Sequence, residues 1–230
     1  MLYQPGLLVG ELSGKAGHTY ATKGPYGTVI TVLGRHRAPL TQYTQSARAS
    51  FRTIQQLFGT LDNDQLDAWT TLGENIIITG RLGRNYQLTA ASVFCQINRN
   101  LYTIGQPYVV DPPAIAYPAD ILGFTCDAQA PPTGSYEINL DLDPDTVPMD
   151  TYFVVYGQKP KNSQGYRYTQ RGWKVLSVIG PGESNVVDVS TEYNTRFHGW
   201  FPLQTIPIRV IPVSSVGFQG NPAINWALST

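Results

Sequence analysis

The stretch Ser-Tyr-Glu-Ile-Asn-Leu at residues 135–140 alternates polar and apolar side chains with the period of two that a half-buried β-strand shows. Similar short segments, rich in β-branched and aromatic residues, recur along the chain and are separated by turn residues. They cover residues 121–126, 151–156, 173–178, 185–189 and 207–213. This pattern predicts that residues 121–230 form an immunoglobulin-like antiparallel β-sandwich of six or seven short strands.

A proline-rich stretch lies immediately upstream, over residues 107–120. It contains Pro107, Pro112, Pro113 and Pro118. We expect a semi-rigid linker or an irregular entry strand here, and therefore a domain boundary. The chain of 230 residues is long enough for two modules, one over residues 1–106 and the other over residues 121–230.

The first module combines strand and helix patterns. Residues 7–38 contain β-branched and aromatic runs between glycines, and a hairpin is expected around residues 24–27. Residues 76–79, Ile-Ile-Ile-Thr, form another expected strand or extended segment. The sequence therefore predicts a small mixed α/β module followed by the sandwich, which places the chain in the α+β class.

A first helix is predicted over residues 41–58. Ala47, Phe51, Ile54 and Phe58 recur there at spacings of four, three and four, which puts them on one helical face.

Two further helices are predicted from their capping residues. Asp62 and Gln65 have the spacing of a capping box, and Gly73 is the expected end of that second helix. Thr89 is the expected cap of a third helix, which Gly105 ends. The first module is thus predicted to contain strands and three helices.

Charge is unevenly distributed although the formal net charge is zero. Residues 1–105 hold 9 Lys/Arg and 5 Asp/Glu, a net of +4, whereas residues 106–230 hold 7 and 11, a net of −4. No acidic residue lies between Glu11 and Asp62, and this span contains Lys15, Lys23, Arg35, Arg37, Arg48 and Arg52. These six residues form a solvated face, an interface for an acidic protein neighbour or, least favoured, a nucleic-acid surface.

No motif for catalysis or cofactor binding is found. The turn at residues 10–16 has three residues between its glycines instead of the four of a phosphate-binding loop, and Ala16 cannot bind magnesium. His18, His36 and His198 lie in no metal-binding or nucleophile motif. We therefore expect neither enzymatic activity nor a cofactor.

Three alternating carboxylates are the weak metal candidates of the chain. Asp141, Asp143 and Asp145 have a spacing that lets them converge on calcium, but the remaining positions of an EF-hand loop are not met. They form either a solvated loop or a weak calcium site, and no metal is expected.

Aromatic residues are the other ligand-binding candidates. Tyr166 and Tyr168 share one face of an expected strand, and Trp200 lies in a second aromatic-rich segment. They pack on the sheet, or they stack on sugars or anchor an interface.

The two cysteines, Cys95 and Cys126, have no metal-binding spacing. Two buried free thiols are expected, and a disulfide between the modules remains the alternative. The first residues lack the features of a signal peptide, and no apolar stretch approaches the ~20 residues of a membrane span.

Several packing motifs occur together within residues 8–105. They are Ser-Gly-Lys-Ala-Gly at 13–17, Tyr-Gly-Thr at 26–28, Arg-Ala-Pro at 37–39, Thr-Gln-Ser-Ala-Arg-Ala-Ser-Phe at 44–51, Leu-Asp-Asn-Asp-Gln-Leu-Asp-Ala-Trp at 61–69, Thr-Ala-Ala-Ser-Val-Phe at 89–94 and Asn-Arg-Asn-Leu at 98–101. This combination resembles a module of tailed-bacteriophage virion structural proteins with the patterns Ser-Gly-x-x-Gly and Gln-x-x-Ala-Trp. Ala90 or Ala91 stands where that group commonly has Gly.

The resemblance implies a non-enzymatic virion component that is oligomeric in the particle. We expect a capsid decoration or minor head protein, or a subunit of the head–tail region, which binds other virion proteins through its basic module. The alternative is a receptor- or glycan-binding fibre or tail component that uses exposed aromatic residues of the sandwich. Nucleic acid and membranes are not expected partners.

Overall fold

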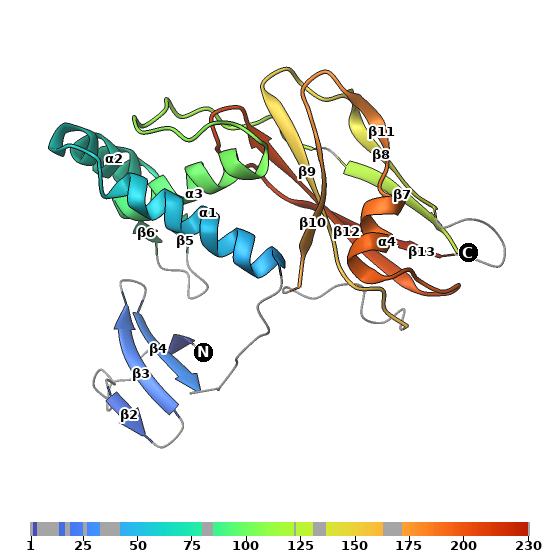
Figure 1. The fold of residues 1–230 in the computed structure, drawn as a ribbon, viewed down its shortest axis with the longest axis horizontal. Coiled ribbons are helices and arrows are strands. Elements are labelled where there is room, and N and C mark those ends of the chain that lie inside the picture. The colour runs from blue at the N-terminus through green and yellow to red at the C-terminus, as the bar shows by residue number, and fades with distance from the viewer. Residues whose placement is uncertain are drawn as a thin grey trace.

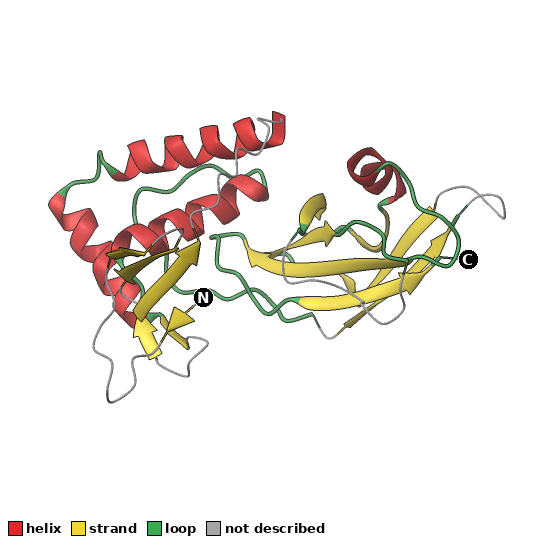
Figure 2. Cartoon of the chain, turned by 90° about the horizontal axis from the view of Figure 1, so that it is seen from below, coloured by secondary structure: helices red, strands yellow, loops and turns green. Residues whose placement is uncertain are grey.

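The computed structural model describes residues 2–3, 14–16, 19–24, 27–32, 42–79, 85–121, 123–130, 137–162 and 172–229. These residues form a mixed α/β structure with four helices and several antiparallel sheets, drawn in Figures 1 and 2. The predicted α+β class therefore agrees with the structure at the level of element content.

The N-terminal strands form a four-stranded antiparallel sheet in the order β1-β4-β3-β2. Its strands are β1 (Leu2–Tyr3), β2 (Gly14–Ala16), β3 (Thr19–Gly24) and β4 (Gly27–Val32). Gly24 pairs with Gly27 where β3 turns into β4. The predicted hairpin around residues 24–27 is therefore confirmed.

Three helices follow: α1 (Gln42–Phe58), α2 (Asn63–Asn75) and α3 (Ala90–Thr103). The Asp62 carboxylate accepts a hydrogen bond from the Gln65 backbone N–H (2.7 Å), and the Gln65 side chain accepts one from the Asp62 N–H (3.2 Å). Thr89 accepts from the Ser92 N–H at 3.3 Å. Both predicted helix starts are thus confirmed, because each cap satisfies a donor that the first helical turn leaves unpaired.

The prediction that Gly73 ends α2 was wrong. The helix continues to Asn75, and a short hairpin of β5 (Ile77–Thr79) and β6 (Asn85–Gln87) follows. A Cβ atom at position 73 would lie 2.4 Å from the Leu88 carbonyl oxygen. Glycine is therefore required for the close approach of the segment that enters α3, and not for ending the helix.

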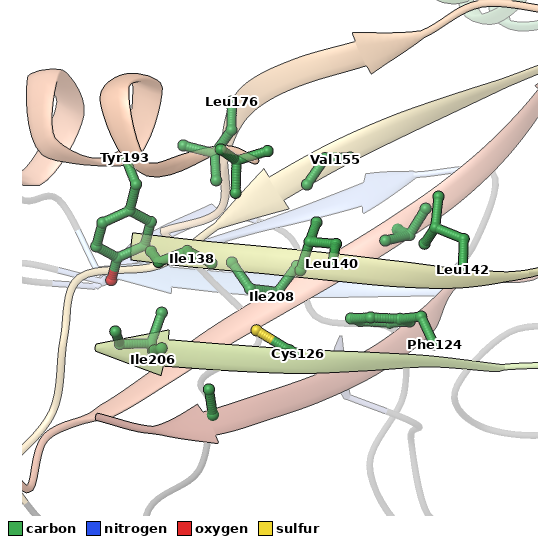
Figure 3. Close-up of a cluster of buried hydrophobic side chains, with 14 of the residues drawn as sticks. Phe124, Cys126, Ile138, Leu140, Leu142, Val155, Leu176, Tyr193, Ile206 and Ile208 are labelled. Atoms are coloured by element: carbon green, nitrogen blue, oxygen red, sulfur yellow. The ribbon is translucent and has the colours of Figure 1, made fainter. Parts of the chain in front are cut away.

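Two antiparallel sheets make up the C-terminal part, which we call the two-sheet unit. One has the order β11-β8-β7 and the other the order β10-β9-β12-β13. Their bounds are β7 (Gly123–Gln129), β8 (Glu137–Thr146), β9 (Thr151–Gly157), β10 (Lys174–Ile179), β11 (Ser184–Asp188), β12 (Thr205–Ser214) and β13 (Ala223–Leu228). Their facing sides share one apolar core, in which Cys126 and Leu140 of the smaller sheet lie with Val155 and Ile208 of the larger one (Figure 3).

A fourth helix, α4 (Ser190–Phe197), interrupts the region that we expected to contain strands alone. It has only eight residues, so its apolar periodicity is too short to detect. Only Ser190 and Tyr193 are buried in it, and the Tyr193 hydroxyl donates to the Gln158 carbonyl at 2.5 Å. This helix therefore closes one end of the core instead of lying along its surface.

Helix α3 lies on the outer face of the larger sheet, and α1 and α2 pack on α3. Val154 of β9 and its register partner Ile211 of β12 lie in a second apolar core with Phe94, Ile97 and Leu101 of α3. The neighbouring residues Val155 of β9 and Val210 of β12 lie in the core between the two sheets instead. The central strands of this sheet are consequently buried on both faces, which explains their nearly continuous burial.

The expected linker over residues 107–120 is fastened to the helices. The Trp69 indole N–H donates to the Val110 carbonyl at 2.7 Å. The Asn98 side chain, fully buried, accepts from the Val109 N–H (2.8 Å) and donates to its carbonyl (3.1 Å). These bonds take the place of secondary structure in satisfying the backbone of this segment.

At Gly217 the two-sheet unit closely approaches α3. A Cβ atom there would lie 2.8 Å from the Ile97 carbonyl oxygen, and its φ is +94°. We expect Gly217→Ala to lower the free energy of unfolding by about 3 kcal/mol or more, since overpacking adds to left-handed strain.

Gly105→Ala is the matched control, because Gly105 also has a positive φ (+75°) but a Cβ there meets no atom within 4 Å. It should lose only about 1 kcal/mol, the strain alone. Chemical denaturation of both variants checks this, and equal losses would contradict the steric account.

Candidate binding groove and apolar loop

The structure describes the side chains of only two of the six basic residues that we expected at an interface. Arg35 and Arg37, and the side chains of Lys15 and Lys23, lie outside the described residues. Arg48 and Arg52 are exposed one helical turn apart on α1. These two residues line a concave feature of the described chain.

That feature is a groove of about 950 Å³ between the helices and the two-sheet unit. Its walls come from α1, the C-terminal part of α3, the start of β10 and the end of α4. The side chains that define it here are Arg48, Phe51, Arg52, Arg99, Tyr102, Lys174 and Arg196. The groove is formed by residues that are far apart in the sequence. A count of charges along the chain therefore detects only the basic residues of α1.

The groove combines an apolar surface with positive charge. Phe51 and Tyr102 remain about half exposed, at 47% and 46%. Tyr102 is stacked on Tyr108, with ring centroids 6.3 Å apart and planes within 7°. Five of the lining residues are Lys or Arg, and none of the described lining residues is acidic. Such a surface attracts an anionic partner and offers aromatic contact area once the partner is bound.

A stacked arginine extends the positive charge along the sheet beside the groove. The Arg209 guanidinium lies 4.7 Å from the Tyr156 ring centroid and 4.8 Å from that of Trp173. Burial raises the pKa of the Tyr156 hydroxyl, and the charges of Arg209 and Arg99 oppose this shift. Arg209 of β12 and Arg99 of α3 therefore both act on the Tyr156 hydroxyl.

The aspartates proposed as weak metal ligands lie on an exposed sheet face. Asp141 and Asp143 alternate with the buried Leu140 and Leu142 along β8, and the Asp145 side chain lies outside the described residues. Within the part of the chain that the structure describes, no group of three His, Cys, Asp or Glu residues is placed to hold a metal ion.

Asp141 and Asp143 instead belong to an acidic surface. Asp127 of β7 and Asp188 of β11 are exposed on the same side of the smaller sheet, where each pairs with Asn139. The strands β7, β8 and β11 contain no Lys or Arg. The outer face of this sheet, which we call the acidic face, is therefore opposite in charge to the groove.

The proposal that Trp200 is an exposed ligand-binding aromatic was wrong. Its side chain is 1% exposed, and its indole N–H donates to the Gln129 carbonyl at 2.8 Å. It packs edge-on against Tyr193, with ring centroids 5.3 Å apart. Tyr166 and Tyr168, the other two candidates, lie outside the described residues.

The residues that follow Trp200 carry the exposed apolar surface that the sequence analysis missed. Phe201 is 70% exposed and Leu203 is 71% exposed. Leu203 also has a φ of +66°, a left-handed conformation that is strained for a large side chain. We call residues 198–204 the apolar loop. The sequence of its aromatic residues, His198, Trp200 and Phe201, does not indicate which side chain is buried.

Hydrogen bonds to Ser229 and within the loop hold the apolar loop in its strained form. The Leu203 N–H donates to the Ser229 carbonyl (2.8 Å), and the Ser229 hydroxyl donates to the Phe201 carbonyl (2.7 Å). The Gln204 side chain accepts from the Phe201 N–H (2.9 Å), and the Gln204 N–H donates to the Ser229 hydroxyl (3.0 Å). Strain that the surroundings maintain in this way is typical of functional positions.

Both cysteines are free thiols, so the two modules are not joined by a disulfide. Cys126 lies in the core between the sheets, whereas Cys95 is half-buried beside the helical core. Burial and, to a smaller extent, the charge of Asp127 raise the pKa of the Cys126 thiol to about 12.

Comparison with protein-family models, curated proteins and solved structures finds no match for this chain. Among the described helices, none has the length and apolar character needed to cross a membrane.

Cys126 should resist alkylation in the folded protein. At about pH 8 its thiol is protonated and buried, so iodoacetamide is expected to modify it only after unfolding. Peptide mass spectrometry before and after addition of denaturant measures this, and rapid native modification of Cys126 would contradict its placement in the core.

The same pKa shift predicts a loss of stability at high pH. The folded-state pKa is raised from 9.0 to about 12, so the neutral thiol stabilises the fold below pH 9 and this contribution falls between pH 9 and 12. Between about pH 10 and about pH 11 the free energy of unfolding should fall by about 1.4 kcal/mol per pH unit. Denaturant midpoints at pH 8 and pH 10 should fall less in Cys126→Ala than in the wild type.

Proposed function

We propose that this protein is a non-enzymatic structural component of a tailed-bacteriophage virion that acts by docking on other virion proteins. The groove with five cationic side chains and exposed aromatic rings is the observation that carries the proposal. Its described lining residues supply charge and contact area but no carboxylate, thiol or imidazole for acid–base or nucleophilic chemistry. Such a surface is suited to assembly.

The proposal that the protein acts in the virion rests on the packing motifs of residues 8–105. The segments at 44–51, 61–69 and 89–94 correspond to α1, α2 and the start of α3. In the resemblance these helices form an anchoring module, and here α1 and α3 supply two walls of the groove. We therefore assign the anchoring role to the groove, and place the protein in a capsid decoration, a minor head position or the head–tail region.

We further infer that the two-sheet unit is an immunoglobulin- or fibronectin-like sandwich. Its first, second and fifth strands form the smaller sheet, and its third, fourth, sixth and seventh form the larger one. This separation of consecutive hairpins between two sheets supports that assignment. Decorating domains of this type present loops at their ends, and the apolar loop occupies such a position beside the C-terminus.

The receptor- or glycan-binding alternative has weaker support. It depended on three aromatic residues, of which Trp200 is buried. The exposed side chains of the apolar loop, Phe201 and Leu203, offer no hydrogen-bonding group that would select a sugar. Docking on protein therefore remains the better-supported function.

Charge reversal in the groove should prevent incorporation into particles. In Arg48→Glu/Arg52→Glu two attractive contacts become repulsive, which we expect to weaken docking by about 2 kcal/mol or more. Quantitative mass spectrometry of purified particles, with wild-type and variant genes, measures the copy number relative to the major capsid protein.

Lys159→Glu is the matched control, because Lys159 is exposed outside the groove. It should leave the copy number unchanged. Absence of the wild-type protein from purified particles would refute the virion assignment. Equal incorporation of the groove variant would instead refute the docking role of the groove.

A further inference from the structure

We propose that the groove of one copy of this chain receives the apolar loop of a second copy, so that subunits assemble head to tail. This inference deepens the proposed function by naming the partner of the groove, and it rests on that function for its biological setting. The argument comes from the preorganised loop, the charge around it and the complementary groove.

The apolar loop has the properties of a preformed binding element. Phe201 and Leu203 project two large apolar side chains into solvent, while Trp200 of the same loop is buried in the core and fixes its base. The hydrogen bonds to Ser229 and Gln204 order the backbone before any partner arrives. Binding therefore requires little further loss of backbone entropy, which favours affinity.

Leu203 strengthens this interpretation. Glycine would adopt its φ of +66° without strain, yet the chain has a leucine there, 71% exposed. Burial of this side chain does not stabilise the isolated subunit. An exposed large apolar side chain held in a strained conformation indicates an interface.

Negative charge lies beside the apolar loop. The bond from Trp200 to Gln129 places the loop at the end of β7, two residues beyond Asp127. Gln129 pairs with Glu137, and the exposed Asp188 lies on the next strand of the same sheet. The donor surface thus consists of two apolar side chains next to the acidic face, with one cation, Lys161, paired to Thr205 immediately after the loop.

The groove has the reverse arrangement. Its exposed Phe51 and Tyr102 offer apolar contact, and its five cations match the carboxylates of the acidic face. Its volume of about 950 Å³ lies at the upper end of the ~300–1,000 Å³ of drug-sized ligand sites, enough for two large side chains. A second copy of this chain is therefore an occupant with both the required shape and the required charge.

The two surfaces share no residue, although Arg196, two residues before the apolar loop, lines the groove. No residue of the apolar loop lines the groove, and the loop lies beside the C-terminus, at the end of the molecule away from α2 (Figure 1). A contact between them is heterologous, so each subunit retains one free loop and one free groove. Repetition closes into a ring or continues as a filament, depending on the rotation between neighbours.

Complementation between two variants tests the contact. The loop variant is Phe201→Ser/Leu203→Gly, in which glycine suits the left-handed backbone. The groove variant is Arg48→Glu/Arg52→Glu, at exposed positions of α1. Met149→Ser, which removes a 79% exposed apolar side chain elsewhere, is the control.

Sedimentation velocity of the purified full chain gives the readout. Wild type and Met149→Ser should increase in mass with concentration, to at least twice the 25.3 kDa of one chain. Each double variant should stay monomeric, and an equimolar mixture of the two should form a dimer and nothing larger, because only one loop and one groove remain intact. Raising the ionic strength from about 0.1 M to about 1 M shortens the Debye length from about 10 Å to about 3 Å and should dissociate the complex.

Three outcomes would overturn the inference. They are a wild-type chain that remains monomeric, association that survives both double variants, and a mixture of the variants that fails to dimerise. Binding of a 20-base-pair DNA duplex by the groove, with the chain still monomeric, would likewise assign the groove to nucleic acid. Since the purified chain is used, failure here is distinct from absence of the protein from particles.

Discussion

The two-sided burial of the larger sheet is the constraint on which the rest of the structure depends. Along β9 and β12, Val154 and Ile211 face the helices while Val155 and Val210 face the smaller sheet. Short helices gain most of their stability from tertiary packing, so α3, which lies on this sheet, depends on it, as do α1 and α2, which pack on α3. The sheet in turn removes its second apolar face from water by accepting them.

This shared sheet also determines where a binding site can form. The groove has one wall on α1 and α3 and the other on β10 and α4, so its shape depends on the fixed junction of the two modules. Gly217, which brings the chain against Ile97, and the bonds of Asn98 and Trp69 to the connecting segment maintain that junction. A flexible linker at residues 107–120 would have left the groove without a defined geometry.

Local signals in the sequence predicted much of the fold but little of the site. The capping box at Asp62, the hairpin at Gly24 and most strands follow from neighbouring residues, and the structure has them. Gly73 was misassigned because its role comes from Leu88, fifteen positions away. The groove could not be predicted from the sequence either, because Arg48 and Arg196, which both line it, are brought together only by tertiary packing. In the aromatic-rich stretch at residues 197–201, only the packing shows that Trp200 is buried and that Phe201 is exposed.

In the proposed head-to-tail assembly, the separation of charge explains how an exposed apolar loop is compatible with specific association. Two loops that met directly would bring two acidic faces together, and the repulsion between like charges opposes that pairing. Two grooves are kept apart by their cations for the same reason. Only the loop of one subunit and the groove of another combine apolar contact with attraction between opposite charges. The charge therefore selects one mode of association from those that hydrophobic contact alone would allow.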